Sequence, residues 1–262
     1  MKQNQWKIPV VYYENELEDE FSAAKITPRK IDGSYDYNGG ILRKTGRVFL
    51  YRLLVTPLAF LYLKIKYHHK IVNRNCLKKA QGTGFFLYGN HTNPIADAVM
   101  PTVLMFPTAA SVIVHPNNVS MPVLGKITPC LGAIPLPDDK DALKNYQKAM
   151  DKVIQKKEGI AIYPEAHIWP YYTGIRNFKD SSLRYPIQYQ VPVFTFTNTY
   201  HKKRFGKSPR IITYVEGPFY PDGEGSIREQ KQRLHALVIS SMKENSKRNT
   251  VELVRYVKKE MD

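Results

Sequence analysis

A histidine and an aspartate stand close together in the chain, just beyond a short apolar run. His91 comes two residues after the run 85–89, and Asp97 follows six residues later. Between them, Asn93 and Pro94 predict a helix start, with Asn93 as the cap and Pro94 at the first helical position. A strand would then deliver the histidine into a loop, and the helix would carry a carboxylate in its first turn. Such a corner suits a general base and the acid that orients it.

The composition sets bounds on the class of protein. The chain has 262 residues, 43% of them hydrophobic, so it can build a sizeable core. Its formal net charge of +16 calls for a polyanionic neighbour, which is nucleic acid, anionic lipid or a phosphorylated substrate. The polar N-terminus shows no signal-peptide pattern. Cys76 and Cys130 are expected to be free thiols in a reducing compartment.

An apolar stretch with basic flanks precedes the His-Asp corner. Residues 53–63 carry no charge, whereas lysines and arginines lie on both sides, for example Arg52 and Lys64. The uncharged run is shorter than the roughly 20 residues of a membrane span. It suits an amphipathic or apolar helix that lies on an anionic membrane surface. The alternative is a buried packing helix with basic ends.

Strand and helix patterns alternate along the rest of the chain. Strands are expected near 85–89, 110–115, 132–136, 160–163, 191–197 and 210–215, and helices near 94–106, 121–131, 139–157, 181–190, 226–247 and 251–259. This alternation predicts an α/β fold, a single domain with a largely parallel central sheet flanked by helices. The expected division is an N-terminal arm over 1–40, a membrane-facing helical segment over 41–75 and the α/β domain over 76–262.

The His-Asp corner resembles the first motif of the glycerolipid acyltransferase family, which includes the 1-acylglycerol-3-phosphate acyltransferases. That motif is Asn-His, four residues and Asp, whereas five residues separate His91 from Asp97 here, after Asn90. On an unbroken helix the aspartate would lie about 120° from the histidine here, and about 140° with the family's spacing, so the two side chains would not meet in either case. A helix that begins only at Pro94 would remove that constraint.

Three further stretches resemble family motifs in the expected order, over roughly residues 80–215. Gly132 opens the second, but Asp138 stands near the family's arginine, which is associated with the acceptor phosphate. Tyr163-Pro164-Glu165 keeps the Pro-Glu of the third motif and loses its Gly, Thr and Arg. The run 191–194 resembles the Val-Pro strand of the fourth. Glu165 is expected to hydrogen-bond a substrate hydroxyl or to hold the site loop.

Basic residues beyond the third motif offer replacements for the missing arginines. Arg176, Lys179 and Arg184 either bind the acceptor phosphate or form a solvated basic face. His167 follows Glu165 closely and is expected to line the site. The substrate-binding residues expected from these motifs are Asn90, Gly132, Glu165, His167, Arg176 and Lys179.

The resemblance implies an acyltransferase that moves a fatty acyl group from a thioester to a hydroxyl of a lysophospholipid or glycerolipid acceptor. The donor would be acyl-CoA or acyl carrier protein. His91 would act as general base and Asp97 would orient it. No metal or cofactor is expected. With an anionic membrane surface as partner, the protein would lie at the cytoplasmic side of the cell membrane as a peripheral protein.

Two alternatives stay open at the level of sequence. The chain could be a catalytically weakened family member that only binds membrane surfaces, since the His-Asp spacing is stretched and arginines are missing. Nucleic-acid binding is a third possibility from charge and aromatic content, but it is not expected, because recognition motifs are absent and the basic residues are dispersed. The serine-hydrolase elbow, the phosphate-binding glycine loop and zinc-ligand spacing are absent as well.

Overall fold

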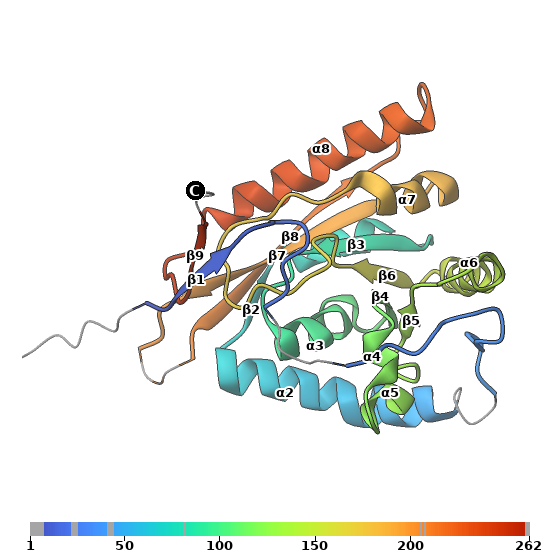
Figure 1. Ribbon diagram of the computed structural model, residues 1–262, viewed down its shortest axis with the longest axis horizontal. Helices are drawn as coiled ribbons and strands as arrows, with labels where there is room; N and C mark the ends of the chain where they lie inside the picture. The colour runs from blue at the N-terminus through green and yellow to red at the C-terminus, as the bar shows by residue number, and fades with distance from the viewer. Residues whose placement is uncertain are drawn as a thin grey trace, which may run out of the picture.

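A seven-stranded sheet forms the centre of the protein in a computed structural model that describes residues 8–21, 26–40, 45–80, 82–204, 206 and 208–259 (Figure 1). Its strand order is β2-β8-β7-β3-β6-β4-β5. In that order the strands are Lys70–Val72, Arg210–Phe219, Val193–His201, Phe85–Gly89, Gly159–Ile162, Ala110–Val114 and Ala133–Pro135. Neighbouring strands run parallel except β7 and β8, which are antiparallel. The sheet is therefore largely parallel, as the sequence predicts.

Helices cover both faces of this sheet (Figure 1). One face packs against α2 (Thr56–Tyr67) and α3 (Pro94–Met105), and the other packs against α6 (Lys140–Gln155), α7 (Arg184–Tyr189) and α8 (Ile227–Ser246). Strand β3 shows why both layers are needed, because all five of its residues are buried. Alternating side chains serve the two cores: Phe85 and Leu87 point to the α2–α3 side, and Phe86 and Tyr88 to the other.

Local sequence signals fix the ends of the main helices. Asn93 caps α3, with its side chain accepting a hydrogen bond from Ala96 N at 3.0 Å, and Pro94 takes the first helical position. Asp139 caps α6 in the same way. Ser226 and Glu229 form a reciprocal capping box at the start of α8. These starts confirm the predicted ones. Shorter turns are η2 (Arg74–Ala80), α4 (Asn117–Ser120), α5 (Leu124–Ile127) and η3 (Asp180–Leu183).

Two predicted helices are wrong or too long. Residues 251–259 form no helix, and β9 (Arg255–Lys258) instead pairs in parallel with β1 (Val10–Tyr13) near the start of the chain. That partner lies more than 200 residues away, so local periodicity could not reveal it. Of the helix expected over 121–131, only α5 forms, since two prolines flank it and Val123 has φ 61°.

The segment before α2 corrects the expected length of the apolar helix. A single helix runs over Arg47–Tyr67, 21 residues, wound as a π-helix in η1 (Arg47–Val55) and as an α-helix in α2. By length and composition it could cross a membrane, although the uncharged run alone is too short. Its buried side chains, Tyr51, Ala59, Leu63 and Tyr67, face the domain. In Figure 1 the helix lies along the outside of the layer that contains α3.

Candidate active site

His91 and Asp97 meet at the carboxyl end of β3, where the chain turns into α3. The imidazole Nδ1 lies 3.0 Å from Asp97 Oδ2. The extra residue in the spacing does no harm, because His91 lies in the loop before the cap and the helical angle does not apply. The sequence places the two groups apart only if the helix is unbroken. Here the loop brings them into hydrogen-bond contact.

The Asp97 carboxylate is fully buried and fully engaged. Its Oδ2 also accepts hydrogen bonds from the backbone N–H groups of Thr92 (2.7 Å) and Asn93 (2.8 Å), at the N-terminus of α3. Its Oδ1 accepts one from Asn198 Nδ2 on β7 at 3.1 Å. These donors offset the cost of burying the polar carboxyl group. They hold the side chain of Asp97 so that Oδ2 faces His91.

One face of the His91 imidazole packs on Tyr163, at the end of β6. The two rings stack with centroids 4.4 Å apart and planes 22° apart. The Tyr163 hydroxyl donates to the backbone oxygen of Asp97 at 2.5 Å, and burial raises the pKa of this phenol well above its usual value. With the ring held at Nδ1 and on one face, Nε2 hydrogen-bonds to nothing within the described residues. The histidine side chain is 18% exposed.

The third motif builds a buried ion pair behind the histidine. Glu165 Oε2 lies 3.2 Å from a guanidinium nitrogen of Arg176, and both side chains are fully buried. The same carboxylate oxygen accepts a long, 3.5 Å hydrogen bond from the backbone N–H of His91. Burial raises the pKa of Glu165, and the neighbouring guanidinium only partly offsets this. Glu165 therefore contacts both the backbone of His91 and Arg176, which is the geometry that the second of its two expected roles, holding the site loop, requires.

The Arg176 side chain is fully buried, and its two terminal nitrogens donate to the protein, whereas Nε has no hydrogen-bond partner among the described residues. Its guanidinium also donates to the backbone oxygens of His167 and Glu16 and lies 4.8 Å from the centre of the Trp169 ring. These contacts tie the loop 163–178 to residues near the N-terminus. In this arrangement Arg176 supports the loop that carries Glu165.

The other residues expected to bind substrate lie in different places. Asn90 is buried, and its side chain exchanges two hydrogen bonds with the backbone of Asn198, at 3.0 and 2.8 Å. It joins the end of β3 to β7. Gly132 has φ 94° and precedes β5, so it lies at the amino edge of the parallel strands, away from His91. A Cβ there would come within 2.4 Å of Ala110 O. Both residues therefore support the fold.

Two polar residues of the loop and its exit differ in exposure. His167 is partly exposed, and its Nδ1 lies 3.2 Å from Glu20 Oε2. Lys179 is exposed and directly precedes η3. Of the six residues expected to bind substrate, these two present side-chain surface to solvent.

Sequence reasoning placed Asp138 near the family's second-motif arginine but missed its partner in the N-terminal arm. Asp138 pairs twice with the backbone of Ile31, through its own N–H at 3.0 Å and through Oδ2 at 2.6 Å. Ile31 is fully buried, so this part of the arm is packed against the carboxyl end of β5. Asn198 was missed as well, since nothing marks it within the apolar and threonine-rich strand 193–201.

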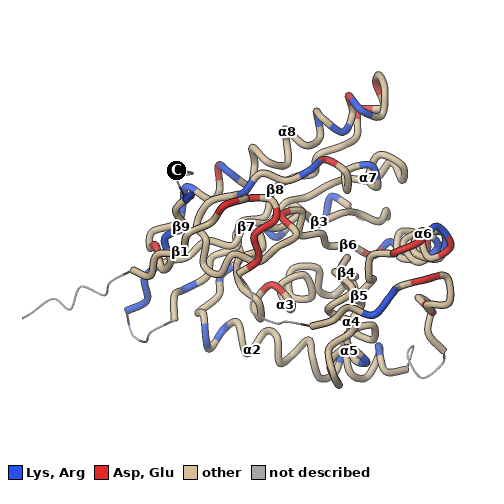
Figure 2. The backbone as a smooth tube through the Cα atoms, viewed as in Figure 1, with Lys and Arg blue, Asp and Glu red and all other residues tan. Residues whose placement is uncertain are grey.

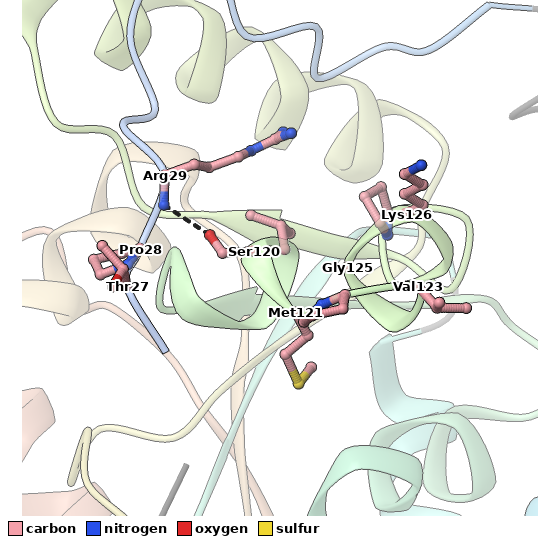
Figure 3. A pocket seen from close by; sticks show the side chains of 11 residues that line it. Thr27, Pro28, Arg29, Ser120, Met121, Val123, Gly125 and Lys126 are labelled. Carbon is pink, nitrogen blue, oxygen red and sulfur yellow. Dashed lines mark hydrogen bonds between the residues drawn. The ribbon is translucent and has the colours of Figure 1, made fainter. Parts of the chain in front are cut away.

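A hollow lies apart from His91. Its volume is about 650 Å³, and Figure 3 shows it between residues 27–29 of the arm and the α4–α5 segment. The backbone N–H of Arg29 donates to Ser120 Oγ at 2.9 Å across its edge. Arg29 and Lys126 line it together with apolar residues. It shares no residue with the surroundings of the dyad. Among the described residues there is also no group of three or more metal-binding side chains.

Comparisons with known proteins identify the fold and nothing finer. Neither protein-family profiles nor characterised protein sequences match the chain. Among solved structures, the crystal structure of the 1-acyl-sn-glycerophosphate (LPA) acyltransferase PlsC from Thermotoga maritima matches with a TM-score of 0.57. The sequence identity is 17%, over 80% of this chain and 85% of that chain. This protein therefore has the fold of that acyltransferase, an α/β domain with a mostly parallel sheet and an apolar helix near the N-terminus.

Proposed function

We propose that the protein is an acyltransferase that moves a fatty acyl group from a thioester to a hydroxyl group of a glycerolipid or lysophospholipid. The observation that carries the proposal is the 3.0 Å contact between His91 Nδ1 and Asp97 Oδ2, with Nε2 left for a substrate. The site lies at the carboxyl ends of parallel strands, where α/β folds bind ligands. The shared fold with an LPA acyltransferase supports the same class of reaction.

The reaction needs one base and no covalent enzyme intermediate. His91 Nε2 takes the proton of the acceptor hydroxyl while the oxygen attacks the thioester carbonyl. Asp97 keeps Nδ1–H in place and stabilises the imidazolium that forms. The tetrahedral intermediate then collapses, the carbon–sulfur bond breaks, and the imidazolium returns the proton to the leaving thiolate. The products are the ester and the free thiol of CoA or of acyl carrier protein.

The acceptor's phosphate, if it carries one, needs a cation other than Arg176. Lys179 is exposed and is the remaining cation among the six residues expected to bind substrate; Arg184, the third basic residue beyond the third motif, is exposed as well. A lysine binds phosphate as a point charge, without the two-pronged geometry of arginine. We therefore propose a looser phosphate contact than the family's arginines provide, which would accept both phosphorylated and neutral glycerolipids.

The helix Arg47–Tyr67 is proposed to place the site at a membrane. Large apolar side chains are exposed along it, namely Val48, Phe49, Leu53, Leu54, Leu58, Phe60, Leu61 and Ile65. Soluble proteins seldom expose so much contiguous apolar surface without a partner. Because the opposite face of the same helix packs on the domain, we propose peripheral attachment along the helix, at the cytoplasmic side of the cell membrane.

The test is lipid mass spectrometry of purified protein with acyl-CoA or acyl carrier protein and a panel of lysophospholipids and neutral acceptors. Wild type should form the acylated product. His91→Ala should lower the rate by at least about 10²–10⁴-fold, the usual worth of a general base. His115→Ala is the matched control, since His115 is exposed at the end of β4 and lies outside the dyad. Full activity of a folded His91→Ala protein would disprove the mechanism.

The alternative of a weakened, membrane-binding relative rests on the stretched spacing and on the missing arginines. The 3.0 Å contact at the dyad answers the first argument and leaves the second. An inactive wild type that still binds vesicles would support this alternative.

A further inference from the structure

A chain of polar side chains leads from Asp97 across β7 and β8 to His69, which lies between α2 and β2. Asp97 Oδ1 lies 3.1 Å from Asn198 Nδ2, and Asn198 Oδ1 lies 2.7 Å from Thr213 Oγ1. Thr213 Oγ1 in turn lies 2.8 Å from His69 Nε2. Together with His91, five side chains are joined in one line of hydrogen bonds. The mechanism above uses only His91 and Asp97.

The acceptors in this chain favour one direction for its hydrogens. The Thr213 hydroxyl also lies 3.6 Å from Met100 Sδ, but the amide oxygen of Asn198 is closer and is the stronger acceptor. A carboxylate oxygen accepts, so the amide nitrogen of Asn198 donates to Asp97. The amide oxygen of Asn198 accepts, so the single hydroxyl hydrogen of Thr213 is donated to it. Thr213 Oγ1 must then accept from His69, which carries its proton on Nε2. Every donor points toward Asp97, and hydrogen bonds aligned in this way strengthen one another.

The pairing of β7 with β8 brings two of these polar side chains together. Asn198 and Thr213 are direct partners across the antiparallel β7–β8 pair. On β7, Asn198 shares its face with Phe196 and Tyr200, and on β8 Thr213 lies between Ile211 and Val215. These neighbours belong to the apolar core next to α2 and α3. A polar side chain in such a core is costly unless its hydrogen bonds are made, and here they are.

We propose that Asn198 is a positioning residue of the dyad, and that Thr213 and His69 hold it in its working orientation. This inference rests on the proposed acyl transfer. Oδ2 of Asp97 already receives three donors, from His91, Thr92 and Asn93. Asn198 supplies the contact at Oδ1, so it fixes the rotation of the carboxylate about its last bond. The carboxylate plane in turn sets the direction of Nδ1–H and hence of Nε2.

His69 suits the outer end of such a chain. Its ring is mostly buried, and burial together with the nearby Lys64 charge lowers its pKa to about 4. It therefore stays neutral around pH 7 and supplies one fixed donor. Its position directly after the helix Arg47–Tyr67 and the left-handed cap at His68 connects the dyad to the end of that helix.

Thr213→Val tests the chain with the smallest change in shape, because it removes only the hydroxyl. We expect kcat to fall about tenfold with KM unchanged, the effect of losing one oriented hydrogen bond. Thr213→Ser keeps the hydroxyl and should restore kcat. Thr197→Val is the matched control on β7, since the Thr197 hydroxyl is also buried but has no hydrogen-bond partner. It should leave kcat unchanged.

Proton NMR of the folded protein tests the same chain without acyl transfer. The downfield signal of His91 Nδ1–H, identified by its loss in Asp97→Ala, should shift in Thr213→Val, return in Thr213→Ser and stay unchanged in Thr197→Val. His69→Leu, at the half-buried outer end, should shift it in the same direction and serves if Thr213→Val does not fold. An inactive wild type with these shifts would overturn the proposed function alone. An unchanged signal and an unchanged kcat in Thr213→Val or His69→Leu would overturn the proposed positioning role of this chain.

Discussion

The extra residue between His91 and Asp97 is absorbed by three loop residues before the helix. Asn93 ends the loop as the cap, and its N–H and that of Thr92 close on the same Asp97 oxygen that faces the histidine. The contact depends on where the helix starts more than on the count of intervening residues. A cap placed two residues earlier would have set the pair about 120° apart on the helix.

Arg176→Met should destabilise the fold, because it leaves Glu165 as an unpaired charge in a dry environment. Loss of one partner of a buried ion pair costs about 3–5 kcal/mol. Denaturant unfolding measures the free energy, and the exposed Lys179→Met is the matched control, with an expected change within about 0.5 kcal/mol. Equal small losses in both variants would contradict the buried role of Arg176. A selective rise in KM for a phosphorylated acceptor in stable Arg176→Met would return it to phosphate binding.

For single residues, the sequence predicts which side chains matter better than it predicts the residues that they contact. Asn93 and Pro94 could be assigned from local chemistry alone, and so could the place of His91 at a strand end. The role of Arg176 could not, since its partners Glu165, Trp169 and Glu16 become neighbours only when the loop and the N-terminal segment have folded together. Asn198 was hidden for the same reason, because its meaning comes from β8 and α3.

At the scale of elements, long amphipathic helices and buried strands were predictable, and edge structure was not. α6 and α8 carry their own caps and periodicity, so their sequence needs no tertiary context. β9 is a strand because β1 is there to pair with it and because Tyr256 stacks on Trp169 at 4.8 Å. The local conformational preference of these four residues is weaker than the stabilisation from pairing with β1, so the pairing decides their structure.

Leu61→Glu should weaken binding to vesicles without weakening the fold. Leu61 is more than half exposed on the helix Arg47–Tyr67, so the charge meets water in the free protein but lipid in the bound one. Losing one buried leucine costs about 1.5–3 kcal/mol, or roughly tenfold or more in partitioning. Leu237→Glu on α8, an exposed leucine across the sheet, is the control and should bind as wild type. Sedimentation with anionic vesicles measures both, and equal binding would place the membrane contact elsewhere.

The whole molecule carries its positive charge in a dispersed form. Figure 2 shows lysines and arginines on α2, α6 and α8, with no single continuous stripe. Acidic residues gather in the described arm, where Glu14, Glu16, Glu18, Asp19 and Glu20 follow one another closely. Dispersed positive charge attracts an anionic surface over a broad area, but it does not form the concentrated basic patch by which proteins bind nucleic acid. The electrostatic contribution to membrane affinity and the contribution of the apolar helix should then be separable by experiment.

Salt should remove the first of these contributions and spare the second. At 0.1 M the screening length is about 10 Å, so charges spread over the whole surface lose their hold on an anionic bilayer as salt rises. The apolar contact of the helix Arg47–Tyr67 is not screened. We therefore expect wild type to bind anionic vesicles tightly at low salt and to retain a weaker, salt-independent affinity at high salt, similar to its affinity for neutral vesicles. Leu61→Glu should keep the salt-sensitive part and lose most of the residual part. Salt-independent binding of wild type to anionic vesicles would show that the net charge of +16 takes no part in docking.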